Sequence, residues 1–168
     1  MIEKRKKTVK IPGAEEWAGY KDDFTARNAH AFWFGKSLDD MQPYFGGGQS
    51  IQRGQDLLFM PQPAFEFYIL AFAQYVMSDA AIGDSDAAST FLGFLTAREK
   101  RDPGSVARIY DQLQATIEFV AESQSRFSAE RDSYGDFREK AAALAALCGK
   151  IFEPPGPLDE MLDSTDDA

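Results

Sequence analysis

The spacing of apolar residues constrains this chain more than any other feature of its sequence. Between its two ends, apolar side chains recur mostly at intervals of three and four residues, which is the period of a helix buried along one face. Segments that alternate apolar and polar residues, as half-buried strands do, are scarce. The pattern predicts an all-α or mostly α fold, with room for one small hairpin at residues 51–59.

The separate runs of regularly spaced apolar residues predict a compact single-domain bundle of about five to six helices. Pro61 and Pro63 suit the first turn of a helix that is apolar on most of its faces, so this helix is expected at the buried centre. Asp84 is placed to cap the next helix, which must turn at residues 102–104. The other predicted helices cover residues 22–32, 38–42 and 105–127, and a last one ends at Cys148 before Gly149.

A local motif marks the start of the short helix at residues 38–42. Ser37 followed by Asp40 has the spacing of a capping box, in which each side chain bonds to the backbone of the other residue. Pro43 is expected to stop that helix. The glycines at positions 46–48 then predict a flexible loop.

Charge divides the chain into three parts. Its 168 residues are the usual size of one domain, and we assign residues 13–152 to the helical domain. Residues 1–12 form a basic tail, because Lys and Arg dominate them. Residues 153–168 form an acidic tail that contains no Lys or Arg and opens with three prolines, Pro154, Pro155 and Pro157.

The net charge excludes one large class of partners. Eighteen Lys and Arg against 27 Asp and Glu give a net charge of -9, which repels the phosphates of nucleic acids. The basic start lacks the apolar segment of a secretory signal. The most apolar stretch, residues 57–77, is broken by prolines and polar residues and falls short of a membrane span. We therefore expect a cytoplasmic protein that binds neither nucleic acid nor membrane.

The sequence holds no recognisable catalytic, metal-binding or cofactor-binding motif. With one histidine and one cysteine it cannot supply the usual ligands of a zinc site. His30 is interpreted as a half-buried helix residue, with a proton carrier as the alternative, and Cys148 as a buried structural thiol. Residues 35–37 resemble the end of a phosphate-binding loop, but that pattern requires a glycine where His30 stands. We therefore do not expect an enzyme.

The excess of acidic residues suits a basic protein partner, because complementary electrostatic potentials accelerate the encounter of two proteins. The candidate contacts are exposed carboxylates and a loop whose glycines permit close backbone approach, namely Asp39, Asp40, Asp84 and Asp86, and Gly46, Gly47 and Gly48. The same residues can also serve as helix caps and a solvated hinge. The sequence leaves both interpretations open.

Residues 57–77, LLFMPQPAFEFYILAFAQYVM, resemble the core segment of small uncharacterised bacterial helical proteins. The resemblance covers about residues 15–147; residues 34–38 also contribute, and its other carriers are Met60, Ala64, Phe65, Tyr68, Ala71 and Phe72. Some of these proteins are encoded beside secreted toxins and are regarded as immunity proteins. The resemblance therefore implies a protein-binding module that neutralises a cognate bacterial toxin, and it carries no catalytic residues. An unrecognised small-molecule-binding protein or enzyme is the alternative.

Overall fold

The computed structural model describes residues 10–152, and within that range the chain is helical and contains no β-strand. Six α-helices have ten residues or more: α1 (Phe24–Trp33), α3 (Ser50–Phe59), α4 (Gln62–Met77), α5 (Ser85–Arg101), α6 (Tyr110–Glu122) and α8 (Phe137–Leu147). Two have four residues: α2 (Leu38–Met41) and α7 (Arg131–Tyr134). Short 3-10 helices connect them: η1 (Tyr20–Asp22), η2 (Gln42–Phe45), η3 (Asp79–Ala81), η4 (Ala107–Ile109) and η5 (Gln124–Phe127). The predicted all-α fold is confirmed, with six longer helices and two single turns.

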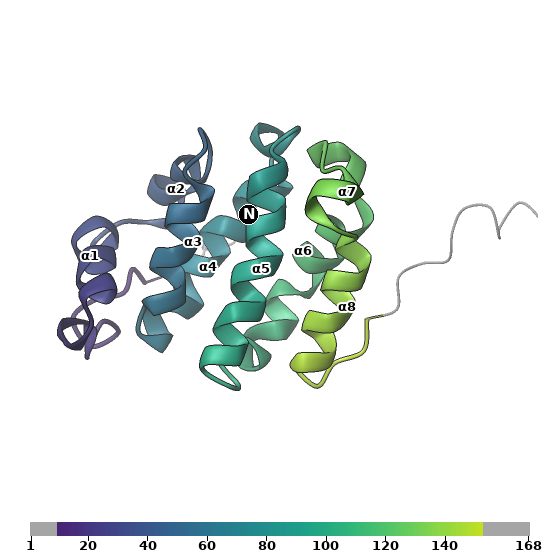
Figure 1. Ribbon diagram of the computed structural model, residues 1–168. Helices are drawn as coiled ribbons and strands as arrows, with labels where there is room; N and C mark the ends of the chain where they lie inside the picture. Colours follow the sequence, from purple (N-terminus) through teal and green to yellow (C-terminus); the bar gives the residue numbers. More distant parts are fainter. Residues whose placement is uncertain (1–9, 153–168) are drawn as a thin grey trace, which may run out of the picture.

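The helices pack in two rows (Figure 1). In one row α1, α3, α5 and α8 lie side by side, and α2, α4 and α6 form the row behind it. Because α3, α4, α5 and α6 alternate in direction, their termini gather at two ends. We name these the Asp84 end (residues 42–51, 77–86 and 123–136), at the top of Figure 1, and the Arg98 end (residues 57–62, 98–110 and 147–152).

Helix α4 is the buried centre of the fold, as its sequence predicts. The predicted stripe is buried throughout and consists of Phe65, Tyr68, Ile69, Phe72 and Val76. Phe72 stacks on Phe45 with ring centroids 4.3 Å apart and meets Phe91 of α5 edge-on at 5.4 Å. Such aromatic pairs add to the stabilisation from apolar burial, so both rows share one core.

The expected hairpin at residues 51–59 is wrong, because this segment forms α3. Leu57 is its one apolar side chain among five buried positions, and the other four are Ser50, Arg53, Gly54 and Asp56. At Gly54 an added Cβ atom would lie 2.5 Å from the Phe94 ring of α5. Helix α3 therefore packs closely on α5 because it has no side chain at Gly54. A search for regularly spaced apolar residues does not detect such a contact.

The predicted helix at residues 105–127 is interrupted at both ends, and only α6 is regular. Gln124 produces the second interruption. Its amide nitrogen donates to the carbonyls of Ala129 and Gly135, at 2.9 and 2.7 Å, and its side-chain oxygen accepts from the Phe137 amide at 3.0 Å. The chain folds around this side chain instead of continuing the helix. The first interruption is caused by Glu99, described below.

The predicted start of α2 and the predicted stop after α8 are confirmed, but Pro43 does not stop the chain after α2, because it lies inside η2, which follows α2 directly. Ser37 Oγ accepts from the Asp40 amide and Asp40 Oδ2 accepts from the Ser37 amide, both at 3.0 Å, which completes the capping box. Helix α8 ends at Leu147, and Gly149 follows with the left-handed backbone (φ 70°) that favours glycine. Local hydrogen-bonding chemistry is thus sufficient to fix these boundaries.

The lone histidine and the lone cysteine occupy packing positions, as predicted. His30 is half-buried in α1 and its ring stacks 3.7 Å from that of Tyr20. Burial, and secondarily the positive charge of Lys21, lower the pKa of His30. Cys148 is buried, and burial raises the pKa of its thiol to about 11. Both groups are therefore neutral at neutral pH.

The two predicted tails lie mostly outside the described residues, which exclude residues 1–9 and 153–168. Of the N-terminal stretch, Lys10 pairs with Glu16 at 3.7 Å and Pro12 is buried. Among the helices of residues 10–152, none has the length and apolar character that crossing a bilayer requires.

Candidate functional site

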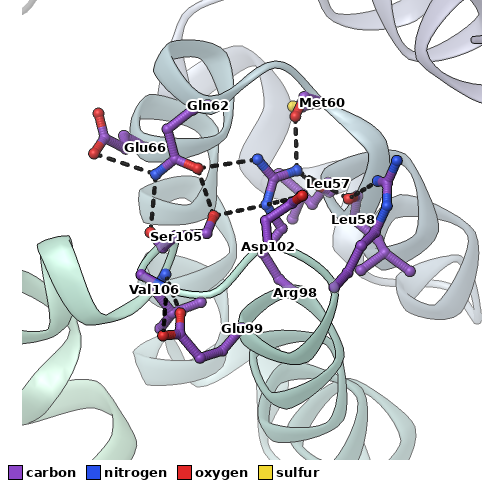
Figure 2. Close-up of polar contacts among 12 residues, drawn as sticks. Leu57, Leu58, Met60, Gln62, Glu66, Arg98, Glu99, Asp102, Ser105 and Val106 are labelled. Atoms are coloured by element: carbon purple, nitrogen blue, oxygen red, sulfur yellow. Dashed lines mark hydrogen bonds and ion pairs between the residues drawn. The ribbon is translucent and has the colours of Figure 1, made fainter. Parts of the chain in front are cut away.

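The Arg98 end is built around a buried guanidinium (Figure 2). Arg98, in the last turn of α5, is only 3% exposed. Its Nη1 donates to the carbonyls of Met60 and Leu58 at 2.6 and 2.9 Å, while its Nε donates to Ser105 Oγ at 2.8 Å. The last carbonyls of a helix lack partners within that helix, so Arg98 closes the C-terminal end of α3.

The charge of Arg98 is stabilised by dipoles more than by a close counter-ion. Its guanidinium lies 4.5 Å from the centre of the Phe65 ring and 3.7 Å from the carboxylate of Asp102, which is itself half exposed. Burial lowers the pKa of Arg98 to about 10, and the nearby Asp102 opposes that shift. The group stays protonated at neutral pH, held mainly by backbone carbonyls.

Glu99, the residue after Arg98, accepts hydrogen bonds from backbone amides, whereas Arg98 donates to backbone carbonyls. It is 4% exposed, and its carboxylate accepts from the amides of Gly104, Val106 and Ala107 at 2.7, 2.8 and 3.3 Å. These amides precede α6 and would otherwise lack acceptors. The turn that they form is the first interruption of the predicted helix at residues 105–127. Two adjacent side chains of α5 therefore end α3 and shape the start of α6.

Gln62, in the first turn of α4, ties this network to the neighbouring helix. Its amide nitrogen donates to the Ser105 carbonyl at 2.9 Å and to Glu66 at 3.3 Å, and its oxygen accepts from Arg98 Nη2 at 3.1 Å. The Ser105 hydroxyl also donates to that oxygen. Sequence reasoning missed this network. One feature of the sequence could have indicated it: Arg98 and Glu99 follow Leu95 by three and four residues, so they lie on the same buried face of α5.

A cavity of about 500 Å³ opens beside the network. Three arginines are among the residues that line it, Arg98, Arg101 and Arg108, together with Asp23 and Asp102. The two further arginines are less constrained than Arg98. Arg101 Nη1 donates to the Leu58 carbonyl at 2.7 Å, and Arg108, with its side chain 68% exposed, lies 3.9 Å from Glu66.

At the Asp84 end, the structure brings two of the predicted contact residues to one tyrosine. Asp84 Oδ1 accepts from the Ala87 amide at 3.1 Å, which caps α5, and its Oδ2 accepts from the Tyr75 hydroxyl at 2.7 Å. An added Cβ atom on Gly46 would lie 3.1 Å from the same hydroxyl oxygen. Burial first, then the hydrogen bond to Asp84 and its charge, raise the pKa of Tyr75. Gly47 and Gly48 follow in the adjoining exposed turn.

Asp86 extends this surface toward α7. The Tyr134 hydroxyl donates to Asp86 Oδ1 at 2.9 Å and accepts from the Ser85 hydroxyl at 2.9 Å. Asp79 lies 3.4 Å from Arg126 Nη2 with its side chain 98% exposed. Gly46, Asp84, Asp86 and Asp79 therefore belong to one connected edge.

Exposed apolar side chains accompany these carboxylates. Ile82, in the loop between η3 and α5, is 54% exposed. Tyr44, Ile51 and Met77 are also exposed at this end. Their exposure places apolar surface and negative charge on the same edge of the molecule.

Asp39 and Asp40 lie on α2, which is followed directly by η2 at the Asp84 end. Asp40 belongs to the capping box, and its hydrogen bonds with Ser37 lower its pKa. Asp39 is exposed beside Phe67 and Gln74 at a shallow hollow of about 230 Å³. Within residues 10–152, no hydrogen bond or ion pair joins either carboxylate to the Asp84 end.

Comparison of the chain with protein-family models, with characterised proteins and with solved structures finds no match. In the described part of the chain, no group of three or more His, Cys, Asp or Glu side chains is arranged to hold a metal ion. The Asp84 end offers an apolar and acidic contact surface, and the Arg98 end offers an open cavity lined by three arginines and two aspartates.

Proposed function

We propose that this chain is a protein-binding module whose Asp84 end binds a basic protein partner. The observation that carries the proposal is the exposure of Ile82, an isoleucine flanked along the loop by Asp79 and Asp84. Interfaces are commonly anchored by an apolar side chain that becomes desolvated inside a polar rim. Carboxylates around such an anchor favour a partner with Lys and Arg at the matching positions.

The loop that presents Ile82 is held in place by contacts on both sides. The Gly83 amide donates to the Arg126 carbonyl at 2.9 Å, and Asp84 is fixed by Tyr75 and by the Ala87 amide. A loop that is already ordered loses less conformational entropy when a partner binds. The net charge of -9 would also attract a basic partner over longer distances.

The partner class that we propose is a cognate bacterial toxin. It comes from the resemblance of residues 57–77 to a family with members regarded as immunity proteins. An acidic, apolar edge is suited to covering a basic toxin domain and blocking its active site or substrate path. The toxin domain should therefore be positively charged on the face that is covered.

The test is co-expression with the product of the adjacent gene, followed by pull-down and a growth-rescue assay. We expect Ile82→Arg to abolish both association and rescue, because it places a long cation at the centre of the contact. Ile151→Arg is the matched control, since Ile151 is also exposed but follows α8 at the Arg98 end, and this variant should behave as the unmodified chain. If the unmodified chain neither associates with the adjacent product nor rescues growth, the pairing is wrong.

A further inference from the structure

We infer that the cavity at the Arg98 end is a binding site for a small oxyanion, a compound that carries phosphate or carboxylate groups. The site lies at the opposite end of α5 from Ile82 and uses none of the residues proposed to contact a protein. The two proposals can therefore fail separately.

The first support is the local reversal of charge. Three guanidinium groups against two carboxylates leave one net positive charge on the side chains that line this cavity, in a chain whose net charge is -9. A guanidinium presents a planar fork of N–H donors that matches the oxygens of carboxylate and phosphate groups. The residues that line this cavity therefore include three such groups.

The second support is the unused hydrogen-bonding capacity of Arg98. Its Nη2 carries two N–H groups, and one of them donates to Gln62. The other has no acceptor among residues 10–152. Because Nε and Nη1 are already bonded to Ser105 and to backbone carbonyls, the orientation of the guanidinium is fixed before any ligand arrives. Such fixed donors bind an anion without first being ordered.

The third support is the position of Arg108. Closing α3 accounts for Arg98, but it does not involve Arg108, which comes from the turn before α6 and lines the cavity from another side. Its side chain is largely exposed and its nearest carboxylate, that of Glu66, is 3.9 Å away. Arg108 is therefore able to turn toward a bound anion. The exposed Arg101 is held more firmly, by the Leu58 carbonyl and by the Phe59 ring 4.2 Å away.

The size of the cavity sets the class of ligand. Ligand pockets span about 300 to 1,000 Å³, and this cavity of about 500 Å³ lies within that range. It holds more than a single inorganic ion. We therefore expect a compact metabolite with one or more phosphate or carboxylate groups.

The test is a nuclear magnetic resonance titration of the full ¹⁵N-labelled chain with pyrophosphate and, separately, with citrate, each at constant ionic strength. We expect saturable shifts of the Gly104 and Ser105 amides with at least one probe. The stronger of the two probes identifies phosphate or carboxylate as the preferred group. The double variant Arg101→Gln with Arg108→Gln should bind about ten-fold more weakly or worse, because two charge-assisted contacts are lost.

The matched control is Arg131→Gln, which removes an exposed arginine of α7 at the Asp84 end and should leave binding unchanged. Circular dichroism and urea unfolding establish that each variant is folded. Shifts that rise linearly with both probes would overturn the site. So would equal affinity in the double variant and the unmodified chain, because binding would then not depend on the cavity arginines.

Discussion

The two ends of the helical array use charge in opposite ways. At the Arg98 end, Arg98 and Glu99 are almost completely buried, and both bond to backbone groups of other elements: Arg98 Nη1 to the carbonyls that end α3, and Glu99 to the amides before α6. At the Asp84 end, Asp79 and Asp86 are exposed and make single contacts with side chains. Removing a buried charged group lowers the free energy of unfolding strongly, because its buried partners lose a polar contact that water cannot replace. Exposed charges contribute little to stability and remain available to a partner.

The largest effect is expected from Arg98→Ala. This change removes the donor of the buried Met60 carbonyl and leaves the Leu58 carbonyl with Arg101 alone, while Ser105 and Gln62 each lose a partner. The free energy of unfolding should therefore fall by about 3 to 5 kcal/mol. Urea unfolding measures this. Arg101→Ala, an exposed change at the same end, should cost far less, and equal losses would show that burial is not what distinguishes Arg98.

A smaller effect is expected from Glu99→Gln. Glutamine keeps the shape of the side chain but loses the charge and one of the two oxygens that accept from the turn at residues 104–107. We expect a loss of about 1 to 3 kcal/mol in the free energy of unfolding. Hydrogen exchange should accelerate first at the Val106 and Ala107 amides. Acceleration centred instead on α3 would contradict the role assigned to Glu99.

Asp84→Ala tests the opposite end. It removes the cap of α5 and the acceptor of the Tyr75 hydroxyl, and we expect a loss of about 1 to 2 kcal/mol. Asp84→Asn is the control, because asparagine keeps a side-chain oxygen that can cap α5. This variant should keep most of the free energy of unfolding that Asp84→Ala loses. A cost as large as that of Arg98→Ala would remove the contrast between the two ends.

The smallest effect is expected from Tyr134→Phe, which deletes one hydroxyl that joins Ser85 and Asp86 to α7. The contact is partly exposed, so the loss in unfolding free energy should be about 0.5 to 1.5 kcal/mol. Thermal unfolding would detect it as a small fall in Tm. A loss above about 3 kcal/mol would mean that this contact contributes like a buried one.

The sequence predicted the parts of the fold that depend on local pattern. The apolar stripe of α4, the capping box at Ser37 and the cap at Asp84 follow from spacing alone, and all three are present. Helix α3 was missed because Arg53 and Gly54 occupy its buried face, where the pattern requires apolar side chains.

The candidate sites depended on tertiary contacts that no local pattern contains. Gly46 and Asp84 both lie at the Tyr75 hydroxyl only because α4 places Tyr75 between them. The sequence alone assigned no role to Arg98, because arginine is mostly an exposed residue. Its acceptors, Leu58 and Met60, lie about 40 residues earlier and are backbone atoms, to which residue type gives no clue.

The length of α5 also fixes the distance between the two ends. Fourteen residues separate the cap at Asp84 from Arg98, which at 1.5 Å per residue places the two about 21 Å apart along the helix. One inserted or deleted residue would shift that spacing and rotate Arg98 and Glu99 by about 100° relative to Asp84. Substitutions on the exposed side of α5, at Gly93 or Lys100, leave this register intact. The fold should therefore tolerate substitutions on the exposed side of α5 far better than a change in the length of α5.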